Sequence, residues 1–424
     1  MTATGFLDEL AWRGLLFQHT DGAAAALAKA PLTGYCGFDP TASSLHAGNL
    51  VAMMSLVHLQ RGGHRPVALV GGGTVMIGDP SGKASERQLL TPDIVDANIA
   101  GISAQLARVL DFDGPRGAVM RNNGDWLRPL DLIGFLRDVG KHFTVNYMLQ
   151  KDSVDARLGS ETGISFTEFS YMLLQAYDFA ELYRRDGVTL QVGGSDQWGN
   201  ITAGTTLVRK MHGVEAHGVT LPLLTTSAGT KFGKSEAGAV WLDAERTSPY
   251  QFYQFWIGAD DRDVGRYLRT FTLLTRAEIE ALDDITAATP EKRAAQQLLA
   301  RMVTTMIHGA GSAQTAAEVS ALLFAKGDPA SLSASALGAL AREVPSADVS
   351  RAESFDTLAL FVAAGLTASK GEARRLLQQG GLSCNGAKLS TDDATLPVGK
   401  LLRGQYLLLR KGARDYALIT VPAS

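Results

Sequence analysis

Cysteine is scarce in this sequence of 424 residues, which contains only Cys36 and Cys384. Two cysteines so far apart along the chain argue against a disulfide framework and against a zinc site built from four cysteines. The eight histidines show no metal-ligand spacing either, so we expect no protein-bound metal. This use of cysteine is typical of a protein from a reducing compartment.

Long apolar runs are also missing. No uninterrupted apolar stretch reaches the roughly 18 residues that a membrane-spanning helix requires. Asp8, Glu9 and Arg13 interrupt the apolar residues near the start of the chain, which argues against a secretory signal peptide. We therefore expect a cytoplasmic protein with no membrane contact.

Charge of one sign does not dominate the chain. The net charge of −3 lacks the basic excess typical of proteins whose whole surface binds polyanions. Residues 351–424 nevertheless hold ten Lys and Arg against six Asp and Glu, so the tail is locally basic. With 46% hydrophobic and 20% charged residues, a chain of this length is expected to fold into several domains.

Three short apolar segments predict strands of a parallel sheet. Thr33–Phe38 precedes a helical pattern that starts at His46, and Arg65–Val70 follows that helix and continues directly into three glycines. Strand, helix, strand and glycine turn form a βαβ unit, whose ligand crevice lies at the carboxyl ends of its strands. Val188–Val192 ends in another glycine turn, so we predict a doubly wound parallel sheet of the Rossmann-like α/β class.

The rest of the chain divides by pattern and composition. Residues 1–247 are expected to form the Rossmann-like catalytic domain, and Ser248 followed by Pro begins a stretch that predicts a helical domain over 248–325. Residues 326–352 are rich in Ala, Ser, Pro and Gly, which is typical of a linker. A small α+β domain is expected over 353–424.

The segment between the first strand and the first helix is a candidate phosphate site. Thr41 and His46 would lie there beside the free N–H groups and the positive dipole end of the helix, a location that suits a triphosphate. The alternative is that His46 merely begins the helix and that Gly48 permits close packing against the strand.

Four cations are placed to complete such a site. Lys231 and Lys234 lie in a glycine-bearing loop, where two flexible side chains can close on a polyphosphate. Lys83 and Arg87 follow the second strand and add charge near the same crevice. The alternatives are a solvated charged loop and ordinary surface charges.

One predicted helix face has an unusual composition. Tyr171, Gln175 and Asp178 share it where a core helix would carry Leu or Val, so the face is either a ligand site or a satisfied structural network. No Ser-His-Asp or Cys-His arrangement stands out, and neither does a pair of carboxylates suited to glycoside chemistry. The site is therefore expected to act by electrostatics rather than through a covalent intermediate.

Taken in order, these segments resemble the bacterial tyrosyl-tRNA synthetases, which are class I aminoacyl-tRNA synthetases, from the N-terminus to the tail. Residues 46–49 and 231–235 match the two class signatures. Residues 35–41, 166–178 and 193–198 resemble the tyrosyl branch.

The sequence departs from the family signatures at four positions. Ala47 replaces a larger apolar residue, Asn49 stands where many relatives carry His, and Phe232-Gly233 replaces the usual Met-Ser. Both lysines of the second signature remain, and Asn49 can still donate a hydrogen bond. The resemblance therefore implies that the chain catalyses the family's reaction, and it leaves the effect of the four changes on the reaction rates undetermined.

The resemblance implies a pocket for a substrate tyrosine. Tyr35 and Asp178 would bind the phenol, with Asp178 accepting its hydrogen bond. A substrate without the hydroxyl would leave these buried polar groups unpaired, an effect for which this family is a standard illustration. The resemblance assigns the ammonium group to Asp79, Tyr171 and Gln175, and it completes the pocket with Asn123 and Gln197.

The resemblance also implies an ATP site. The tyrosine carboxylate would attack the α-phosphate of ATP, and tyrosyl-adenylate would donate tyrosine to the terminal ribose of tRNA(Tyr), with Mg²⁺ arriving on the nucleotide. The implied catalytic residues at the γ-phosphate and the departing pyrophosphate are Thr41, His46, Lys83, Arg87, Lys231 and Lys234. The implied ATP-binding residues are Cys36, Gly37, Asp39, His46, Gly48, Asn49, Gly194, Asp196, Lys231, Lys234 and Ser235.

The tail resembles a small RNA-binding module found in ribosomal proteins and pseudouridine synthases. The resemblance rests on Ser369 and on residues 365–366, 372–375, 380–381 and 385–386, and the basic excess of the tail suits phosphate contacts. A plain helix–strand cap is the alternative. The resemblance further implies that the helical domain recognises the anticodon arm, and that residues near Phe166 lie at the interface of a two-fold homodimer.

Two rivals to a tyrosine–tRNA ligase stay open at this point. A tryptophanyl-tRNA synthetase would share both signatures, but Tyr35 and Asp178 suit a phenol better than an indole. A non-catalytic RNA-binding protein on the same scaffold would not need His46, Lys231 and Lys234, all of which are present.

Overall fold

The computed structural model describes residues 5–81, 90–159, 163–235, 238–325 and 327–422. By their internal contacts the residues form two compact units, here named the N-terminal unit and the C-terminal unit. The first contains Met1–Thr247 and Gly258–Leu299, and the second contains Ser248–Ile257 and Ala300–Ser424. Within the described ranges, we find no helix with both the length and the apolar character needed to span a membrane.

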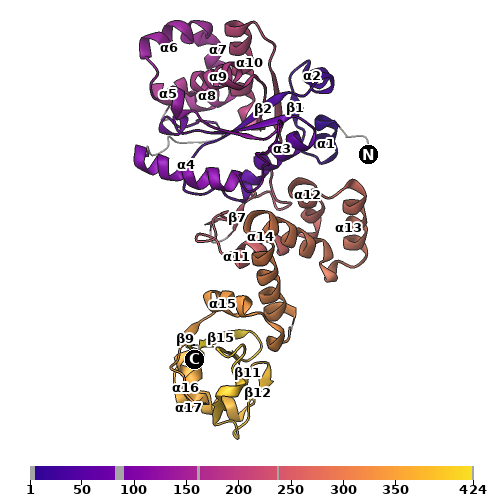
Figure 1. The fold of residues 1–424 in the computed structure, drawn as a ribbon, viewed down its shortest axis with the longest axis vertical. Coiled ribbons are helices and arrows are strands. Elements are labelled where there is room, and N and C mark those ends of the chain that lie inside the picture. The colour runs from indigo at the N-terminus through magenta and orange to yellow at the C-terminus, as the bar shows by residue number, and fades with distance from the viewer. Residues whose placement is uncertain (1–4, 82–89, 160–162, 236–237, 326, 423–424) are drawn as a thin grey trace. The chain divides into compact units, whose positions relative to one another are not determined.

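A largely parallel sheet forms the centre of the N-terminal unit (Figure 1). Its strands are β1 (Gln18–His19), β2 (Thr33–Phe38), β3 (Arg65–Val70), β4 (Val119–Asn122), β5 (Val188–Gly194) and β6 (His217–Leu221). The order is β1-β6-β5-β2-β3-β4, and each neighbouring pair is parallel except β1 with β6. The chain builds from β2 outward to β4 and then returns to the other side of β2, which confirms the doubly wound sheet.

Helices cover both faces of this sheet. Figure 1 shows α3 (Leu50–Arg61) and α4 (Pro92–Leu106) on one side of it, and α9 (Phe166–Asp186) and α10 (Trp198–His212) on the other. The shorter helices of this region are α1 (Phe6–Trp12), α2 (Ala23–Lys29), α5 (Gly124–Leu127), α6 (Leu132–Asp138), α7 (Val145–Leu149) and α8 (Asp152–Leu158).

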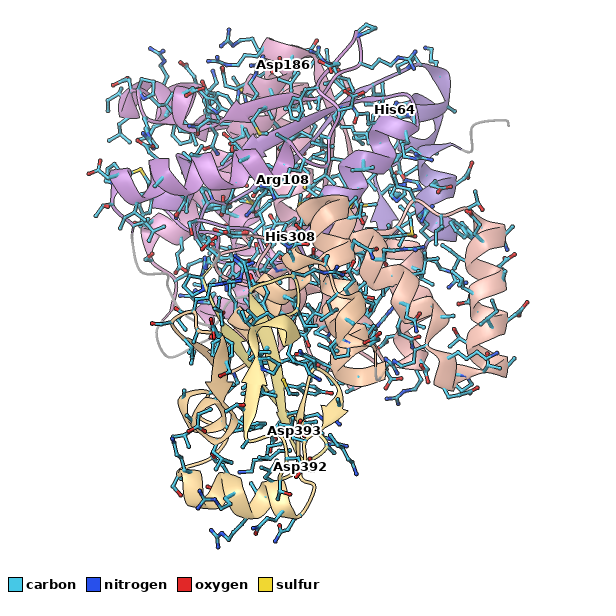
Figure 2. All side chains as sticks on the ribbon, turned by 60° about the horizontal axis from the view of Figure 1, so that its bottom comes forward. His64, Arg108, Asp186, His308, Asp392 and Asp393 are labelled. Atoms are coloured by element: carbon cyan, nitrogen blue, oxygen red, sulfur yellow. The ribbon has the colours of Figure 1, made fainter. Side chains whose placement is uncertain are left out.

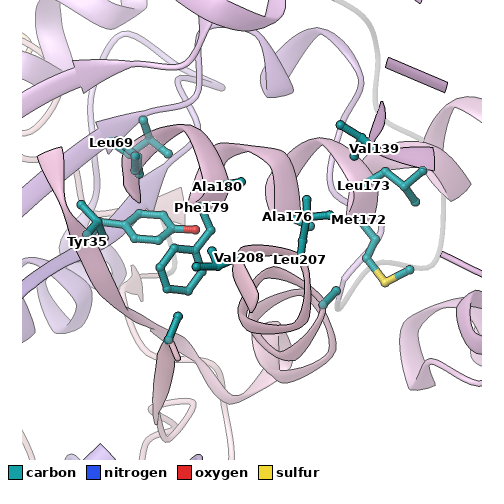
Figure 3. Packing of buried hydrophobic residues seen from close by; sticks show 14 of the residues in the cluster. Tyr35, Leu69, Val139, Met172, Leu173, Ala176, Phe179, Ala180, Leu207 and Val208 are labelled. Carbon is teal, nitrogen blue, oxygen red and sulfur yellow. The ribbon is translucent and has the colours of Figure 1, made fainter. Parts of the chain in front are cut away.

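The side chains of the central strands alternate between the two helical layers. Tyr35 and Leu69 join Phe179 of α9 in one buried cluster, part of which Figure 3 shows. On the opposite face of β2, a Cβ at Gly34 would lie only 2.9 Å from the side chain of Leu59 in α3. Burial on both faces explains why these strands are nearly continuous apolar runs in the sequence.

Residues 249–325 are helical, as their periodicity predicts. The helices are α11 (Pro249–Ile257), α12 (Asp261–Phe271), α13 (Arg276–Ala288) and α14 (Ala294–Ala325). Within α14, Gly309 has φ 83° and ψ 160°, so two helical segments meet there at a kink. Because α12 and α13 belong to the N-terminal unit and α11 to the C-terminal unit, a separate helical domain over 248–325 stays a prediction.

The segment expected to be a linker, residues 326–352, contains packed secondary structure. It includes α15 (Ala334–Glu343) and β9 (Ser346–Asp348). Leu337 and Leu340 of α15 are fully buried in a cluster with other residues of the C-terminal unit. The linker prediction is corrected for this reason: alanine-rich composition suits a helix as well as a connector, because alanine has the highest helix propensity.

The C-terminal unit ends in the expected small α+β fold. Its helices and strands are β10 (Ser354–Asp356), α16 (Thr357–Ala363), α17 (Lys370–Gln378), β11 (Leu382–Cys384), β12 (Ala387–Lys388), β13 (Thr395–Pro397), β14 (Tyr406–Lys411) and β15 (Asp415–Thr420). The main sheet has the order β12-β11-β14-β15-β9. Leu407 and Leu409 of β14 pack in one apolar cluster with Phe361, whereas Leu408 between them packs with α15. This alternation places one helical layer on each face of the sheet.

Two carboxylates anchor α9 at its ends. Glu168, in the first turn, accepts hydrogen bonds of 2.9 and 2.8 Å from Arg157, and both side chains are at most 5% exposed. At the other end Asp186, labelled in Figure 2, pairs with Arg121 of β4 at 2.6 Å. The helix that carries the predicted ligand face is therefore fixed to both α8 and the sheet.

Removal of one partner of the buried pair should destabilise the N-terminal unit. We expect Arg157→Met to lower the free energy of unfolding by about 3–5 kcal/mol, because Glu168 would remain buried and unpaired. The double variant Arg157→Met/Glu168→Leu should recover most of that loss. As a control, Arg137→Ala at an exposed ion pair should leave stability close to that of the wild type. Denaturant titration measures these differences, and a wild-type midpoint for Arg157→Met would contradict the prediction.

Candidate active site

The predicted site residues gather at the carboxyl ends of the parallel strands. Asp39 follows β2, Asn123 follows β4, and Gly194 ends β5. After β3, the backbone comes so close that a Cβ on Gly71 would lie 2.3 Å from Oδ1 of Asp39. These strand ends flank the position where the order of the sheet reverses, which is where open α/β sheets bind their ligands.

The two short motifs of the sequence meet in the structure. The N–H of Ala47 donates to the carbonyl oxygen of Val240 at 2.7 Å, and the N–H of Val240 donates to that of Gly233 at 3.1 Å. A Cβ on Gly233 would lie 2.6 Å from the amide nitrogen of Gly48, and its φ is 87°. Position 233 therefore requires glycine for both space and conformation.

His46 is held in a capping box at the start of a 3₁₀ turn over Ala47–Asn49. Its Nδ1 accepts the N–H of Gly48 at 3.1 Å, and its own N–H donates to Oδ1 of Asn49 at 3.0 Å. Because Nδ1 accepts, the proton of the neutral ring lies on Nε2, which can donate to an anion. Asn49, a departure from the family signature, thus orients the histidine backbone.

The loop that carries Lys231 rests on α12. Phe232 is 4% exposed, and its ring packs against Tyr267 and Phe271 with centroids 5.0 and 5.1 Å away. Asp263 of the same helix accepts a backbone N–H of the loop at 2.9 Å. The phenylalanine in the second motif therefore anchors the loop in an aromatic cluster, while the neighbouring lysine stays exposed.

Two of the predicted phosphate-binding residues, Thr41 and Lys231, have exposed side chains. The backbone of the second motif continues into a short antiparallel pair, β7 (Lys234–Ser235) with β8 (Gly238–Ala239). Outside the described residues lie Lys83, Arg87 and the side chains of Lys234 and Ser235.

A buried phenol and a buried carboxylate occupy the space between β2 and α9. Tyr35 reaches toward α9, where its ring meets Phe179 edge-on at 5.2 Å (Figure 3). Tyr35 and Asp178 are 1% and 2% exposed, and the Tyr35 hydroxyl has no hydrogen-bond partner within the described part of the chain. Burial, reinforced by the charge of Asp178, raises the pKa of Tyr35, and burial raises the pKa of Asp178 to about 7.

Asp178 is held by two donors. Nδ2 of Asn123 and Nε1 of Trp126 each donate to one of its carboxylate oxygens at 2.8 Å. Asn123 also donates to Oγ1 of Thr74 at 2.9 Å, and Thr74 donates to Asp39 at 3.2 Å. Each oxygen of Asp178 has one protein donor here and retains the capacity to accept another.

A second polar network links α10 to α9. Gln197 donates to Oδ2 of Asp79 at 2.8 Å. Asn200 donates to Oε1 of Gln175 at 3.0 Å and to Oε1 of Gln197 at 3.1 Å. Burial raises the pKa of Asp79, against the lowering effect of the hydrogen bonds that it accepts. This network orients two of the residues predicted to bind an ammonium group.

The predicted helix face of α9 is divided between these two networks. Tyr171 donates to Asp39 at 3.4 Å, Gln175 accepts from Asn200, and Asp178 belongs to the first network. The structure therefore brings all three positions to the strand ends, where each contacts residues from other elements.

Of the predicted ATP-binding residues, Cys36 and Gly37 lie on β2, Gly194 ends β5, and Asp196 follows it. Burial raises the pKa of the Cys36 thiol to about 12. Gly37 is exposed and its Cβ position is open, whereas a Cβ on Gly194 would lie 2.4 Å from Oδ1 of Asp196. Since Cys36 follows Tyr35 directly in β2, its side chain points to the opposite face of the sheet.

Sequence reasoning missed three residues that complete the networks: Thr74, Trp126 and Asn200. Trp126 follows Asn123 by three positions, and Asn200 follows Gln197 by three, which places each pair on one side of a helical turn. A search for polar partners at this spacing after each strand end would have identified both. Thr74 had only its position after the glycine turn to mark it.

The arrangement can bind two different chemical groups. The carboxylate and the unpaired phenol hydroxyl suit a ring that carries a hydroxyl, whereas the capped turn with its histidine and the lysine loop suit phosphate. No group of three or more His, Cys, Asp and Glu side chains among the described residues is arranged to hold a metal ion.

Residues 27–325 match the family described as class I tRNA synthetases (W and Y), and residues 337–419 match the tyrosine–tRNA ligase SYY-like C-terminal domain. The chain is 55% identical over 417 residues to a tyrosine–tRNA ligase of Anaeromyxobacter dehalogenans, an alignment that covers 98% of this chain and 99% of that relative. Against a tyrosine–tRNA ligase of Geobacillus stearothermophilus the identity is 52% over 417 residues, with 97% and 99% covered.

Solved structures agree with these sequence matches. A C-terminally truncated mitochondrial tyrosyl-tRNA synthetase from Aspergillus nidulans is similar with a TM-score of 0.69 and 30% identity, covering 76% of this chain and 94% of that one.

The raised pKa of Asp178 predicts a pH-dependent stability. Between the usual aspartate pKa of about 4 and about 7, the folded chain keeps a proton on Asp178 that the unfolded chain has lost. The free energy of unfolding should therefore fall as pH rises through this window, by up to about 1.4 kcal/mol per pH unit. Asp178→Asn should remove this contribution, and Asp125→Asn, at an exposed carboxylate, should keep it. Denaturant titrations across the window test this, and equal slopes for wild type and Asp178→Asn would contradict it.

Proposed function

The chain belongs to the class I tRNA synthetase family, among its bacterial tyrosine–tRNA ligases, and from this premise we propose how its residues divide the reaction. The matches to tyrosine–tRNA ligases along almost the whole chain, together with the tyrosine–tRNA ligase C-terminal domain, set aside the tryptophanyl and the non-catalytic alternatives. The observation that carries the proposal is the contact between Gly48 and Gly233, which brings the two motifs together in the unit whose sheet and α9 also carry Tyr35 and Asp178.

Tyr35 and Asp178 bind the phenol of the substrate tyrosine in this proposal. The substrate hydroxyl donates to Asp178 and accepts from Tyr35, which supplies the partner that the buried Tyr35 hydroxyl otherwise lacks. Asn123 and Trp126 hold the carboxylate in place for this bond. A substrate without the hydroxyl, such as phenylalanine, would leave the buried Tyr35 hydroxyl without a partner and would deprive Asp178 of one hydrogen bond.

The ammonium group of the substrate binds at the second network. Asp79 supplies the carboxylate, and Gln175 and Tyr171 supply oxygen acceptors. Gln197 supports this arrangement because it already donates to Asp79, and Asn200 does the same for Gln175.

The triphosphate of ATP binds at the joint of the two motifs. His46 donates from Nε2 to the γ-phosphate, Thr41 donates its hydroxyl, and the positive dipole end of α3 adds to the attraction. The N–H groups of Ala47, Gly48 and Asn49 are not free for phosphate, because they donate to Val240 and to His46. The cations proposed to stabilise the departing pyrophosphate are Lys83, Arg87, Lys231 and Lys234. The residues proposed around the rest of the nucleotide are Cys36, Gly37, Asp39, Gly48, Asn49, Gly194, Asp196 and Ser235.

Activation needs no protein base in this scheme, because the tyrosine carboxylate is already ionised when it attacks the α-phosphate. A bond forms between a carboxylate oxygen and the α-phosphorus, and pyrophosphate leaves with the negative charge that the cations stabilise. Mg²⁺ accompanies the triphosphate, whose oxygens are ligands that it prefers. The terminal ribose hydroxyl of tRNA(Tyr) then attacks the tyrosyl carbonyl, and AMP leaves.

The tail and the helical region provide the contacts with tRNA. The basic excess of residues 351–424 suits RNA phosphates, and residues 248–325 are proposed to contact the anticodon arm. A cytoplasmic location stays a prediction of the sequence.

We further propose a homodimer through the outer faces of α6, α7 and the start of α9. The inner faces of these helices share one buried cluster, which includes Phe135, Met148 and Met172. Their outer faces leave large apolar side chains in solvent, such as Ile133 at 68% and Phe166 at 79% exposure. Apolar side chains gathered on neighbouring elements are typical of a protein interface.

Tyrosine, and not tryptophan, should support exchange of pyrophosphate into ATP. We expect His46→Ala and Lys231→Ala to slow this exchange by about 100-fold or more, because each removes a group that stabilises charge in the transition state. The tyrosine Kd, measured by equilibrium dialysis, should change little. Lys29→Ala, at an exposed lysine outside the site, is the matched control. Equal losses in exchange and in tyrosine binding would argue against a transition-state role.

The proposed interface can be tested with a charge at its centre. Ile133→Asp and Phe166→Asp should each weaken dimerisation by at least about 30-fold, the effect of losing about 2 kcal/mol at an interface hot spot. Phe17 directly precedes β1 and is 59% exposed, so Phe17→Asp should leave dimerisation unchanged. Sedimentation equilibrium measures the dissociation constants. Dimerisation that survives both substitutions would rule out this surface.

A further inference from the structure

One face of α4 is joined to the loop between β2 and the first motif, residues 39–45. Asn98, Gly101 and Gln105 share that face of the helix at positions i, i+3 and i+7. Nδ2 of Asn98 donates to the carbonyl oxygen of Pro40 at 2.9 Å. At Gly101 the helix and the loop are in backbone contact, since a Cβ there would lie 2.2 Å from a carbonyl oxygen of the loop.

Gln105 uses both ends of its side-chain amide. Its Oε1 accepts the N–H of Leu45 at 2.8 Å, and its Nε2 donates to Oγ of Ser44 at 2.9 Å. Oγ of Ser44 also accepts the N–H of Asp243 at 3.1 Å. Gln105 and Ser44 are 7% and 4% exposed. One buried side chain of α4 thus connects the loop before the first motif with the segment after the second.

The attachment points stand next to the residues proposed to act on ATP. Asn98 bonds to Pro40, the residue before Thr41, and Gln105 bonds to Leu45, the residue before His46. Thr41 itself is exposed, and its backbone N–H donates locally, to the carbonyl oxygen of Asp39 at 2.8 Å. A change in either helix contact would therefore displace a phosphate-binding residue before it disturbed the tyrosine pocket.

We propose that Asn98 and Gln105 are positioning residues for tyrosine activation, which hold Thr41 and His46 in register with the γ-phosphate of ATP. The proposal rests on the roles proposed above for Thr41 and His46. Neither α4 residue touches the reacting atoms in this scheme; each acts through the backbone of the loop. Because a displacement of about 1 Å in a catalytic group can cost about 100-fold in rate, small shifts of this loop are sufficient.

The test is a double-mutant cycle between α4 and the first motif. Gln105→Met keeps the size of the side chain and removes both of its hydrogen bonds to the loop. We expect it to lower kcat for tyrosine-dependent exchange by at least about tenfold, with the tyrosine Kd within about twofold of wild type. In a His46→Ala background the same substitution should cost less than about twofold, because the group that it positions is already absent.

Controls separate positioning from a general loss of stability. Ile102→Met alters a buried residue on the same helix without a polar contact to the loop, and it should leave kcat unchanged at a comparable loss in melting temperature. Ser44→Ala removes the hydrogen bonds of Oγ with Gln105 and Asp243 but keeps that between Leu45 and Gln105. It should lower kcat in the same direction, which keeps the proposal testable if Gln105→Met does not fold.

Three results would overturn the proposal. The first is a normal kcat in both Gln105→Met and Ser44→Ala, and the second is an equal fall in Ile102→Met. The third is a full additional loss in the His46→Ala background. If His46→Ala alone left exchange unchanged, both the proposed role of His46 and this inference would be wrong. If His46→Ala slowed exchange and the losses of the two substitutions were additive, only this inference would be wrong.

Discussion

Backbone pairing between residues 45–47 and 240–242 is the constraint on which the site depends. The N–H of Leu242 donates to Leu45 at 2.9 Å and that of Ala47 to Val240 at 2.7 Å, and a glycine contact lies beside them. The main chain therefore sets how closely the histidine turn and the lysine loop approach each other. Side chains fix both segments from behind. Phe232 packs in an aromatic cluster with α12, and the buried amides of Asn98 and Gln105 on α4 bond to residues 40–45 before the histidine turn.

The buried pair of Tyr35 and Asp178 follows a different principle, because the proposed selectivity for a phenol depends on polar groups that the described part of the chain leaves incompletely paired. A buried hydroxyl without a partner costs free energy, and a buried carboxylate that titrates near neutrality costs more. In the proposed binding mode, the hydroxyl of the substrate completes the hydrogen bonding of both groups. Trp126 and Asn123 already fix the carboxylate, so this mode requires little reorganisation.

Much of the fold is local in origin and was predictable. Strands β2 and β3 have the predicted bounds, because continuous apolar runs between turn residues leave few alternatives. Other elements depend on partners that no local pattern reveals. β1 has two residues and exists through its pairing with β6, and α15 is held by leucines from the distant β14 and β15. The composition of residues 326–352 suggested a linker, because composition contains no information about contacts with distant strands.

By itself, the sequence determined the chemistry of the site: which side chains carry charge, which can bond to a phenol, and that the glycines of both motifs leave room for close approach. It also determined the family, because the motifs and their order along the chain can be recognised without knowledge of the fold. Only the tertiary structure decided that Gly233 packs on Gly48, that Trp126 rather than solvent completes Asp178, and that α4 holds the loop of Thr41. These are contacts between residues far apart in the chain, and their distances follow from the packing of helices on the sheet, which local patterns do not encode.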